Sequence, residues 1–177
     1  MVVAGIDVGA TYTKVVLCED GKVVGRSLLP TGFNFARAAE RGLQQAAEAA
    51  GLRREDVAYV AATGYGRHMV PFRDLAVTDL TAQAWAVHRL YPQARTILDI
   101  GGQNVKAIRV DERGRVRAFR LNDKCAAGSG AFLEKTMRYM GYTAADIARL
   151  AEAAQEPAVV SSVCAVFAES EVINHLV

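Results

Sequence analysis

The sequence repeats a short pattern after about ninety residues, and this repeat limits the possible folds more than any other feature. Residues 7–16 read Asp-Val-Gly-Ala-Thr-Tyr-Thr-Lys-Val-Val, and residues 99–108 read Asp-Ile-Gly-Gly-Gln-Asn-Val-Lys-Ala-Ile. The aspartate, the first glycine and the lysine recur at a constant offset of 92 residues. A period of this length is too long for a solenoid and is typical of two similar domains that face one another. We predict a first domain at residues 1–94 and a second at residues 95–177.

Each copy of the pattern predicts a strand that delivers a carboxylate to a tight turn. An aspartate in this place can hold Mg²⁺ through its waters, and the backbone amides of the turn can cradle phosphate oxygens. Two such turns would grip a polyphosphate from both sides, and Gln103 is a candidate to orient a water for hydrolysis. A single Asp-x-Gly is also a common turn between strands. The equivalence of Asp7 and Asp99 favours the phosphate site.

The predicted order of elements is that of an α/β protein. In the first copy we expect strands at residues 2–9, 12–18, 22–28 and 57–63, and helices at residues 34–50 and 78–90. Asn34 is the expected N-cap of the first helix, and Glu19-Asp20-Gly21 indicates a hairpin. In the second copy three strands start at Thr96 and end at Leu121, followed by helices at residues 130–140 and 143–154 and a helix start at Ala165.

Composition excludes several classes of function. The chain has 177 residues, of which 51% are hydrophobic, and a net charge of +2 from 21 basic and 19 acidic residues. It contains no run of like charges that would indicate a nucleic-acid arm or a membrane patch. The first residues lack a signal-peptide pattern, and no apolar run is long enough to span a bilayer. We therefore expect a cytoplasmic protein with neither nucleic acid nor membrane as a partner.

The three cysteines are an odd number at wide spacing, which argues against a disulfide framework. Cys18 lies in a predicted strand and is interpreted as a small buried side chain. Cys125 and Cys164 each precede a predicted helix start, where unpaired amides stabilise a thiolate as a metal ligand or nucleophile. Two thiolates are half of a four-ligand site, which a two-fold dimer would complete. From the residues alone, incidental free thiols remain an alternative, and zinc would be satisfied as well as iron.

Two glycine-rich segments are further candidates for binding loops. Residues 63–67, Thr-Gly-Tyr-Gly-Arg, follow a predicted strand, the usual place for a binding loop in an α/β sheet, although an ordinary loop fits equally well. Gly128-Ser129-Gly130 opens a predicted helix. It either binds phosphate or provides small residues that let two subunits approach closely.

Five segments together closely resemble the activator component of 2-hydroxyacyl-CoA dehydratases and the related ATP-binding subunits of benzoyl-CoA reductase. They are residues 122–133 (Asn-Asp-Lys-Cys-Ala-Ala-Gly-Ser-Gly-Ala-Phe-Leu), 164–173 (Cys-Ala-Val-Phe-Ala-Glu-Ser-Glu-Val-Ile), 5–9, 62–67 and 99–103. The resemblance spans the whole chain, and its two cysteine motifs are highly specific.

The resemblance implies the α/β fold of the actin and sugar-kinase ATPases, which is ribonuclease H-like and duplicated. It also implies ATP with Mg²⁺, a homodimer that shares one 4Fe–4S cluster, and delivery of a low-potential electron to an acyl-CoA dehydratase or reductase. By resemblance, Cys125 and Cys164 are the cluster ligands, and the catalytic candidates are Asp7, Asp99 and Gln103. The implied nucleotide-binding residues are Gly9, Ala10, Thr11, Tyr12, Thr13, Lys14, Gly101, Gly102, Asn104, Lys106, Gly128, Ser129 and Gly130.

The chain departs from the family pattern in ways that keep two alternatives open. Asn104 stands where the family usually has an aspartate, and Asp79 and Ala82-Gln83 replace family positions with Glu and Cys-His. The second copy never reaches a counterpart of residues 57–66, so we expect an incomplete second domain, weak ATP binding, little hydrolysis and association through an exposed second-domain surface. One alternative is a non-catalytic regulatory module that binds nucleotide or cluster. The other is a sugar- or acetate-type kinase, against which the cysteine motifs count.

Overall fold

The computed structural model describes residues 1–122 and 129–177 of the chain. By their contacts these residues form two compact units. One unit contains residues 1–97 and 108–118, and the other contains residues 98–107 and 119–177. The predicted domains at 1–94 and 95–177 remain a prediction.

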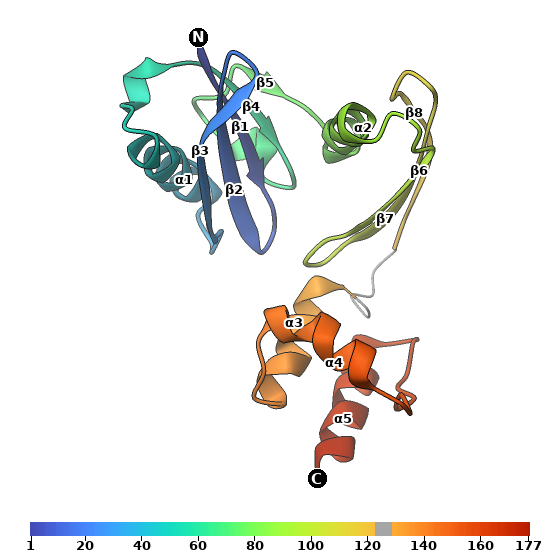
Figure 1. The fold of residues 1–177 in the computed structure, drawn as a ribbon. Helices are drawn as coiled ribbons and strands as arrows, with labels where there is room; N and C mark the ends of the chain where they lie inside the picture. Colours follow the sequence, from blue (N-terminus) through green and yellow to red (C-terminus); the bar gives the residue numbers. More distant parts are fainter. Residues whose placement is uncertain (123–128) are drawn as a thin grey trace. The chain divides into compact units, whose positions relative to one another are not determined.

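The first unit contains a five-stranded sheet with the strand order β3-β2-β1-β4-β5 (Figure 1). Its strands are β1 (Val2–Val8), β2 (Tyr12–Glu19), β3 (Lys22–Pro30), β4 (Val57–Thr63) and β5 (Leu75–Ala76). β1, β2 and β3 are antiparallel neighbours, whereas β4 runs parallel to β1. The predicted hairpin is confirmed: Asp20 and Gly21 both have positive φ, as a two-residue type I′ turn requires. β5 was not predicted, because two residues are too short for a periodic signal.

Helix α1 (Phe35–Ala49) covers one face of this sheet (Figure 1). Asn34 caps it as predicted, since its side chain accepts a hydrogen bond of 2.9 Å from the Arg37 amide. The buried face of α1 is rich in alanine, which lets the helix approach the strands closely. Its contacts form the main hydrophobic core, which includes Ile6, Val8 and Leu17 from the strands and Leu43 from the helix.

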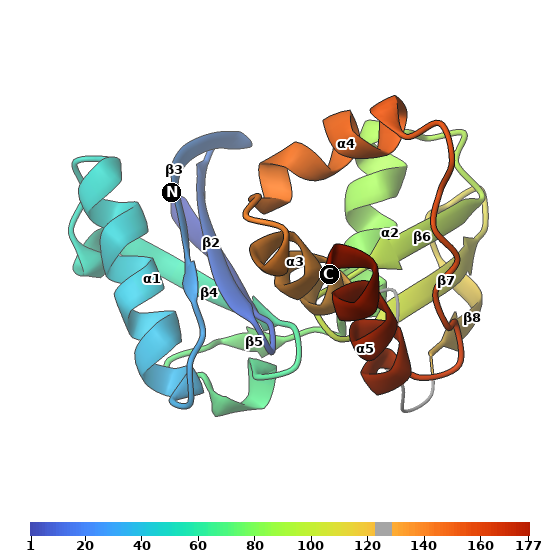
Figure 2. The same ribbon diagram turned by 90° about the horizontal axis from the view of Figure 1, so that it is seen from below.

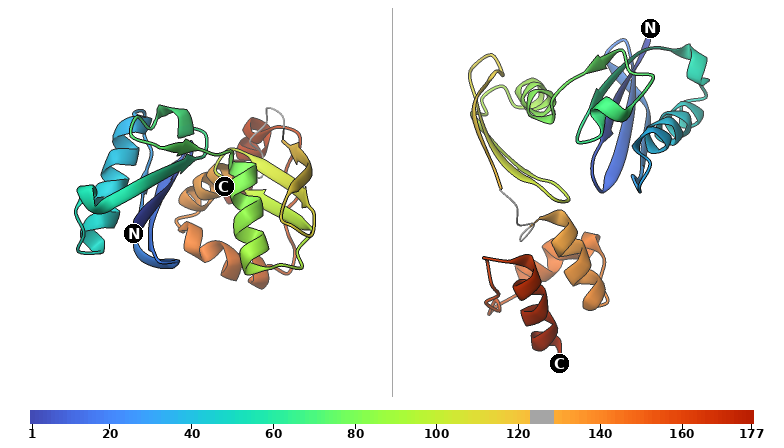
Figure 3. Two further views of the ribbon diagram at one scale, coloured as in Figure 1. Left: turned by 90° about the horizontal axis from the view of Figure 1, so that it is seen from above. Right: turned by 180° about the vertical axis from the view of Figure 1, so that it is seen from behind.

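A second, three-stranded sheet contains the second copy of the repeated pattern. Its order is β6-β7-β8, with β6 at Thr96–Ile100, β7 at Val105–Val110 and β8 at Val116–Leu121. Helix α2 (Asp79–Leu90), capped by Thr78, lies against this sheet (Figure 3). Ala84 of α2 packs on Ile108 and Val110 in a small buried cluster.

The remaining helices are α3 (Gly130–Tyr139), α4 (Ile147–Ala153) and α5 (Ala165–Leu176), with short 3-10 turns at Arg54–Asp56, Arg67–Met69 and Ala144–Asp146. The predicted helix at 143–154 begins as a 3-10 turn, because Thr143 and Asp146 form a reciprocal capping box. α3 and α5 lie side by side (Figure 2). Among the described residues, no helix has both the length and the apolar character needed to cross a membrane.

Candidate functional site

The first aspartate turn places a carboxylate and an ammonium group side by side at the end of the sheet. Asp7 is the penultimate residue of β1 and pairs with Lys14 of β2 in the antiparallel register. Lys14 Nζ donates to Asp7 Oδ2 over 2.9 Å, and both side chains are accessible to solvent, at 52% for Lys14 and 35% for Asp7. An accessible charged pair of this kind can be opened by a ligand with little desolvation cost.

The turn that follows Asp7 is held by hydrogen bonds from two directions. The Gly9 amide donates to the Tyr12 carbonyl over 3.1 Å, and a Cβ at Gly9 would lie 2.8 Å from that same oxygen, so glycine is required here. The Thr31 hydroxyl donates to the Gly9 carbonyl over 2.8 Å. Thr13 is fully buried, with its hydroxyl 2.9 Å from that of Thr31. The side chain of Thr13 therefore supports the turn from inside, while Ala10 and Thr11 at its tip are partly exposed.

A third strand contributes to this site, and sequence reasoning gave it little weight. Thr63 at the end of β4 pairs with Asp7 across the parallel register, so Lys14, Asp7 and Thr63 form one row over three strands. Gly64 follows with a φ of 84°, and a Cβ there would collide with Asp7 Oδ1. Within the described part of the chain, the buried Thr63 hydroxyl has no hydrogen-bond partner. A glycine directly after a parallel strand beside Asp7 was the available signal.

The second turn repeats the geometry of the first in a more buried setting. Lys106 Nζ donates to Asp99 Oδ2 over 2.8 Å, and the side chains are only 11% and 26% exposed. The Gly101 amide donates to the Asn104 carbonyl over 2.8 Å, the counterpart of the bond from Gly9 to Tyr12. Residue 104 closes the turn through its backbone carbonyl, so this contact does not depend on the asparagine side chain.

The start of α3 closes over this second turn. The amides of Gly130 and Ala131 donate to the carbonyls of Gly101 and Gly102, each over 2.8 Å. Ser129, the N-cap of α3, is fully buried, whereas Gln103 at the turn is exposed. The first turn of a helix carries a partial positive charge, which favours an anion nearby. Gly128, also predicted to bind phosphate, lies outside the described residues.

Cys164 is the N-cap residue of α5. The backbone amides of Phe167 and Val166, in the first turn of α5, lower the pKa of the Cys164 thiol. A thiolate favoured in this way suits a metal or iron–sulfur ligand. Cys125, its predicted partner, lies outside the described residues, and the described residues contain no cluster of three or more potential metal ligands. Cys18 is a half-buried free thiol on β2.

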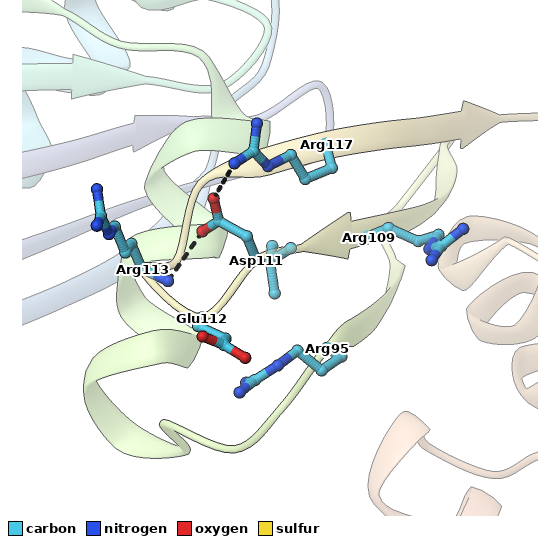
Figure 4. A pocket seen from close by; sticks show the side chains of 7 residues that line it. Arg95, Arg109, Asp111, Glu112, Arg113 and Arg117 are labelled. Carbon is cyan, nitrogen blue, oxygen red and sulfur yellow. Dashed lines mark hydrogen bonds and ion pairs between the residues drawn. The ribbon is translucent and has the colours of Figure 1, made fainter.

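A separate hollow of about 650 Å³ lies at the β7–β8 hairpin and is lined by Arg95, by residues 109–113 and by Arg117, not by residues of either aspartate turn (Figure 4). The carboxylate of Asp111 in this hollow already has partners, since it accepts hydrogen bonds from the amides of Arg113 and Arg115 and pairs with Arg117 Nη2. Figure 4 shows that the Arg109 and Arg113 side chains point in opposite directions. Guanidinium groups that diverge do not form a phosphate cradle, so this hollow does not compete with the aspartate turns.

Comparison with known proteins agrees with this geometry. The sequence profile of the BadF/BadG/BcrA/BcrD ATPase family matches residues 4–177. The chain belongs to this family.

Relatives within the BadF/BadG/BcrA/BcrD ATPase family include the activator of lactoyl-CoA dehydratase from Anaerotignum propionicum, which is 44% identical over 99% of this chain and 68% of its own length. The activator of 2-hydroxyisocaproyl-CoA dehydratase from Clostridium difficile, solved with bound ADPNP, superimposes with a TM-score of 0.91 at 37% identity. That comparison covers 99% of this chain and 66% of the activator. The chain therefore spans about two thirds of the length of these relatives.

A solved sugar-kinase structure also confirms the fold prediction. The ROK hexokinase from Thermus thermophilus, a sugar kinase, superimposes with a TM-score of 0.51 at 18% identity, over 88% of this chain and 70% of the hexokinase. At this level of identity the likeness concerns the fold alone. The chain therefore has the α/β fold of the sugar-kinase and actin type.

Proposed function

We propose that this protein is an ATP-hydrolysing activator that delivers low-potential electrons to an acyl-CoA dehydratase or reductase. The observation that carries the proposal is the duplicated turn, in which Asp7 with Lys14 and Asp99 with Lys106 recur with the same contacts. The resemblance of the motifs and the ADPNP bound to a family relative support a nucleotide as the ligand. The activation of lactoyl-CoA dehydratase by a relative supports an enzyme of this class as the electron acceptor.

In the proposed nucleotide-binding function the carboxylate of an aspartate turn would hold Mg²⁺ through its waters, and the amides of the turn would contact the phosphates. Lys14 and Lys106 exchange part of their contact with the carboxylates for phosphate oxygens. The exposed side chain of Gln103 orients the attacking water. Phosphoryl transfer requires mainly positioning and charge stabilisation, and these residues provide both.

In the proposed electron-transfer site, Cys125 and Cys164 hold a 4Fe–4S cluster together with the same two cysteines of a second copy. Such a cluster stores and releases single electrons at low potential. Support comes from the surroundings of Cys164, because Val163, Val166 and Phe167 are 80%, 67% and 64% exposed. Apolar side chains exposed next to a metal ligand fit a subunit interface centred on that ligand.

A second function, a nucleotide- or cluster-binding regulatory module, is favoured by one residue. Asn104 replaces the carboxylate that the family usually places beside the phosphates, which would slow hydrolysis without removing the turn. The two functions differ in turnover and not in binding.

The test is anaerobic purification with iron, sulfide and ATPase assays on the parent and on three variants. We expect about four iron atoms per dimer in the parent, loss of iron in Cys125→Ser and Cys164→Ser, and no loss in the control Cys18→Ser. Unchanged iron and dimerisation in both ligand variants would refute the cluster. If the parent binds nucleotide without hydrolysing it, and Asn104→Asp restores hydrolysis, the regulatory module would be favoured.

A further inference from the structure

Helices α3 and α5 each bury few side chains completely. In the described residues of each helix only one side chain is buried, Met137 in α3 and Ala168 in α5. Val166 and Ile173 of α5 remain 67% and 42% exposed. Polar contacts between the two helices therefore contribute to the orientation of α5 against α3.

One carboxylate on α5 makes these polar contacts with two side chains of α3. Glu169 Oε1 accepts from Tyr139 Oη over 2.5 Å, and the Lys135 ammonium lies 2.7 Å and 2.8 Å from the two Glu169 oxygens. Hydrogen bonds from Lys135 and Tyr139 lower the pKa of Glu169, while the same carboxylate raises the pKa of Lys135. Both groups therefore stay charged at neutral pH. We call this set of three residues the α3–α5 clasp.

The other end of α3 is attached to the second aspartate turn. The amides of Gly130 and Ala131 donate to the carbonyls of Gly101 and Gly102. The contact is close, since a Cβ at Gly130 would lie 3.2 Å from the Gly101 oxygen. A shift of this turn must therefore move the first turn of α3 or break two hydrogen bonds.

We propose that Glu169 is a positioning residue that couples the second aspartate turn to Cys164. A continuous set of contacts leads from Gly101 and Gly102 through α3 and the clasp to α5, which begins directly after Cys164. A change at the turn, such as loss of the terminal phosphate, reaches Cys164 through the clasp as a movement of α5. The cluster-related part of this inference rests on the proposed function, whereas the coupling between turn and helix does not.

The first experiment measures the clasp itself by amide hydrogen exchange of the metal-free chain. Glu169→Gln keeps the shape of the side chain but removes its charge, and we expect exchange in α5 to become at least about threefold faster. Lys135→Glu combined with Glu169→Lys restores an ion pair and should restore slow exchange. Glu152→Gln on the exposed side of α4 is the matched control. Unchanged exchange in Glu169→Gln would overturn the proposal.

The second experiment measures coupling by a double-mutant cycle. Gly130→Ala pushes the start of α3 away from Gly101, so we expect about twofold faster exchange or more in α5 of the parent. In the Glu169→Gln background the same change should leave α5 unaffected. An effect of equal size in both backgrounds, or no effect in either, would refute coupling through Glu169.

The third measurement concerns the cluster and separates this proposal from the proposed function. After anaerobic reconstitution we expect Glu169→Gln to keep its iron but to shift the midpoint potential and the electron paramagnetic resonance spectrum, with Glu152→Gln unchanged. Full iron with an unshifted potential would refute the positioning role and leave the proposed function intact. A parent that binds no iron would refute the proposed cluster. The double-mutant cycle measured by hydrogen exchange would still test the coupling between the turn and α5.

Discussion

Ile6 and Leu98 occupy equivalent positions of the two copies, yet Ile6 is 1% exposed and Leu98 is 65% exposed. Helix α1 covers the face of the first sheet that carries Ile6. In the second sheet α2 packs on the face of Ile97, and because side chains alternate along a strand, Leu98 points to the opposite face. Ile100, Phe119 and Leu121 are also about half exposed. Among the described residues, the same pattern thus gives a covered face in one copy and an uncovered apolar face in the other.

This difference predicts unequal costs for the same substitution. Ile6→Ala removes a fully buried side chain and should lower the free energy of unfolding by about 2–4 kcal/mol. Leu98→Ala removes an exposed one and should change it by less than about 1 kcal/mol. Urea unfolding followed by circular dichroism measures both. Equal losses would mean that the face of Leu98 is covered in solution.

The uncovered face also predicts self-association of the 177-residue chain. Replacing Leu98 and Phe119 by serine removes apolar area from this face, so the average mass in sedimentation at micromolar concentration should move toward the monomer. The exposed Leu28 of β3, changed to serine, is the control for a general effect on solubility. Sedimentation that does not respond to the double change would assign association to another surface.

The first aspartate turn predicts a loss of metal-dependent nucleotide binding in Asp7→Ala. The carboxylate lies near the end of the central strand β1 and is 35% exposed, so the fold should remain intact while affinity for Mg-ATP falls by about tenfold or more. Titration calorimetry with and without Mg²⁺ measures this, and Glu40→Ala on α1 is the control. Parent-like Mg-ATP affinity in Asp7→Ala would remove Asp7 from the site.

The two lysines should differ in what they contribute to stability. Lys106→Met leaves the half-buried Asp99 without its partner and should cost about 1–2 kcal/mol of unfolding free energy. Lys14→Met affects an accessible pair and should cost less than about 0.5 kcal/mol. Chemical unfolding of both variants measures the two losses of unfolding free energy. A larger loss at Lys14 would contradict the burial seen here.

The hairpin between β7 and β8 should open in acid because of Asp111. Hydrogen bonds from the Arg115 and Arg113 amides and the charge of Arg117 lower the pKa of Asp111. Its stabilising effect is therefore complete above its ordinary pKa of about 3.9 and is lost as pH falls through the lowered value. Nuclear magnetic resonance of residues 111–117 during acid titration measures this opening. Asp111→Asn should abolish the acid dependence, and Glu112→Gln should retain it.

The sequence by itself determined the elements and the paired turns. Asn34 as a cap, the Asp20-Gly21 hairpin and the repeated Asp-x-Gly act over a few residues, so their signals are present in short stretches of sequence. It also indicated a thiolate site at Cys164, because a cysteine directly before a helix start is a local pattern as well.

Only the tertiary structure decided which residues complete these sites. Thr63 joins Asp7 through pairing of strands separated by α1, and Glu169 meets Lys135 across 34 residues of sequence. The exposure of Leu98 depends on which helix covers which face of its sheet. Such contacts depend on how whole elements pack, and neither side-chain periodicity nor residue spacing specifies that packing.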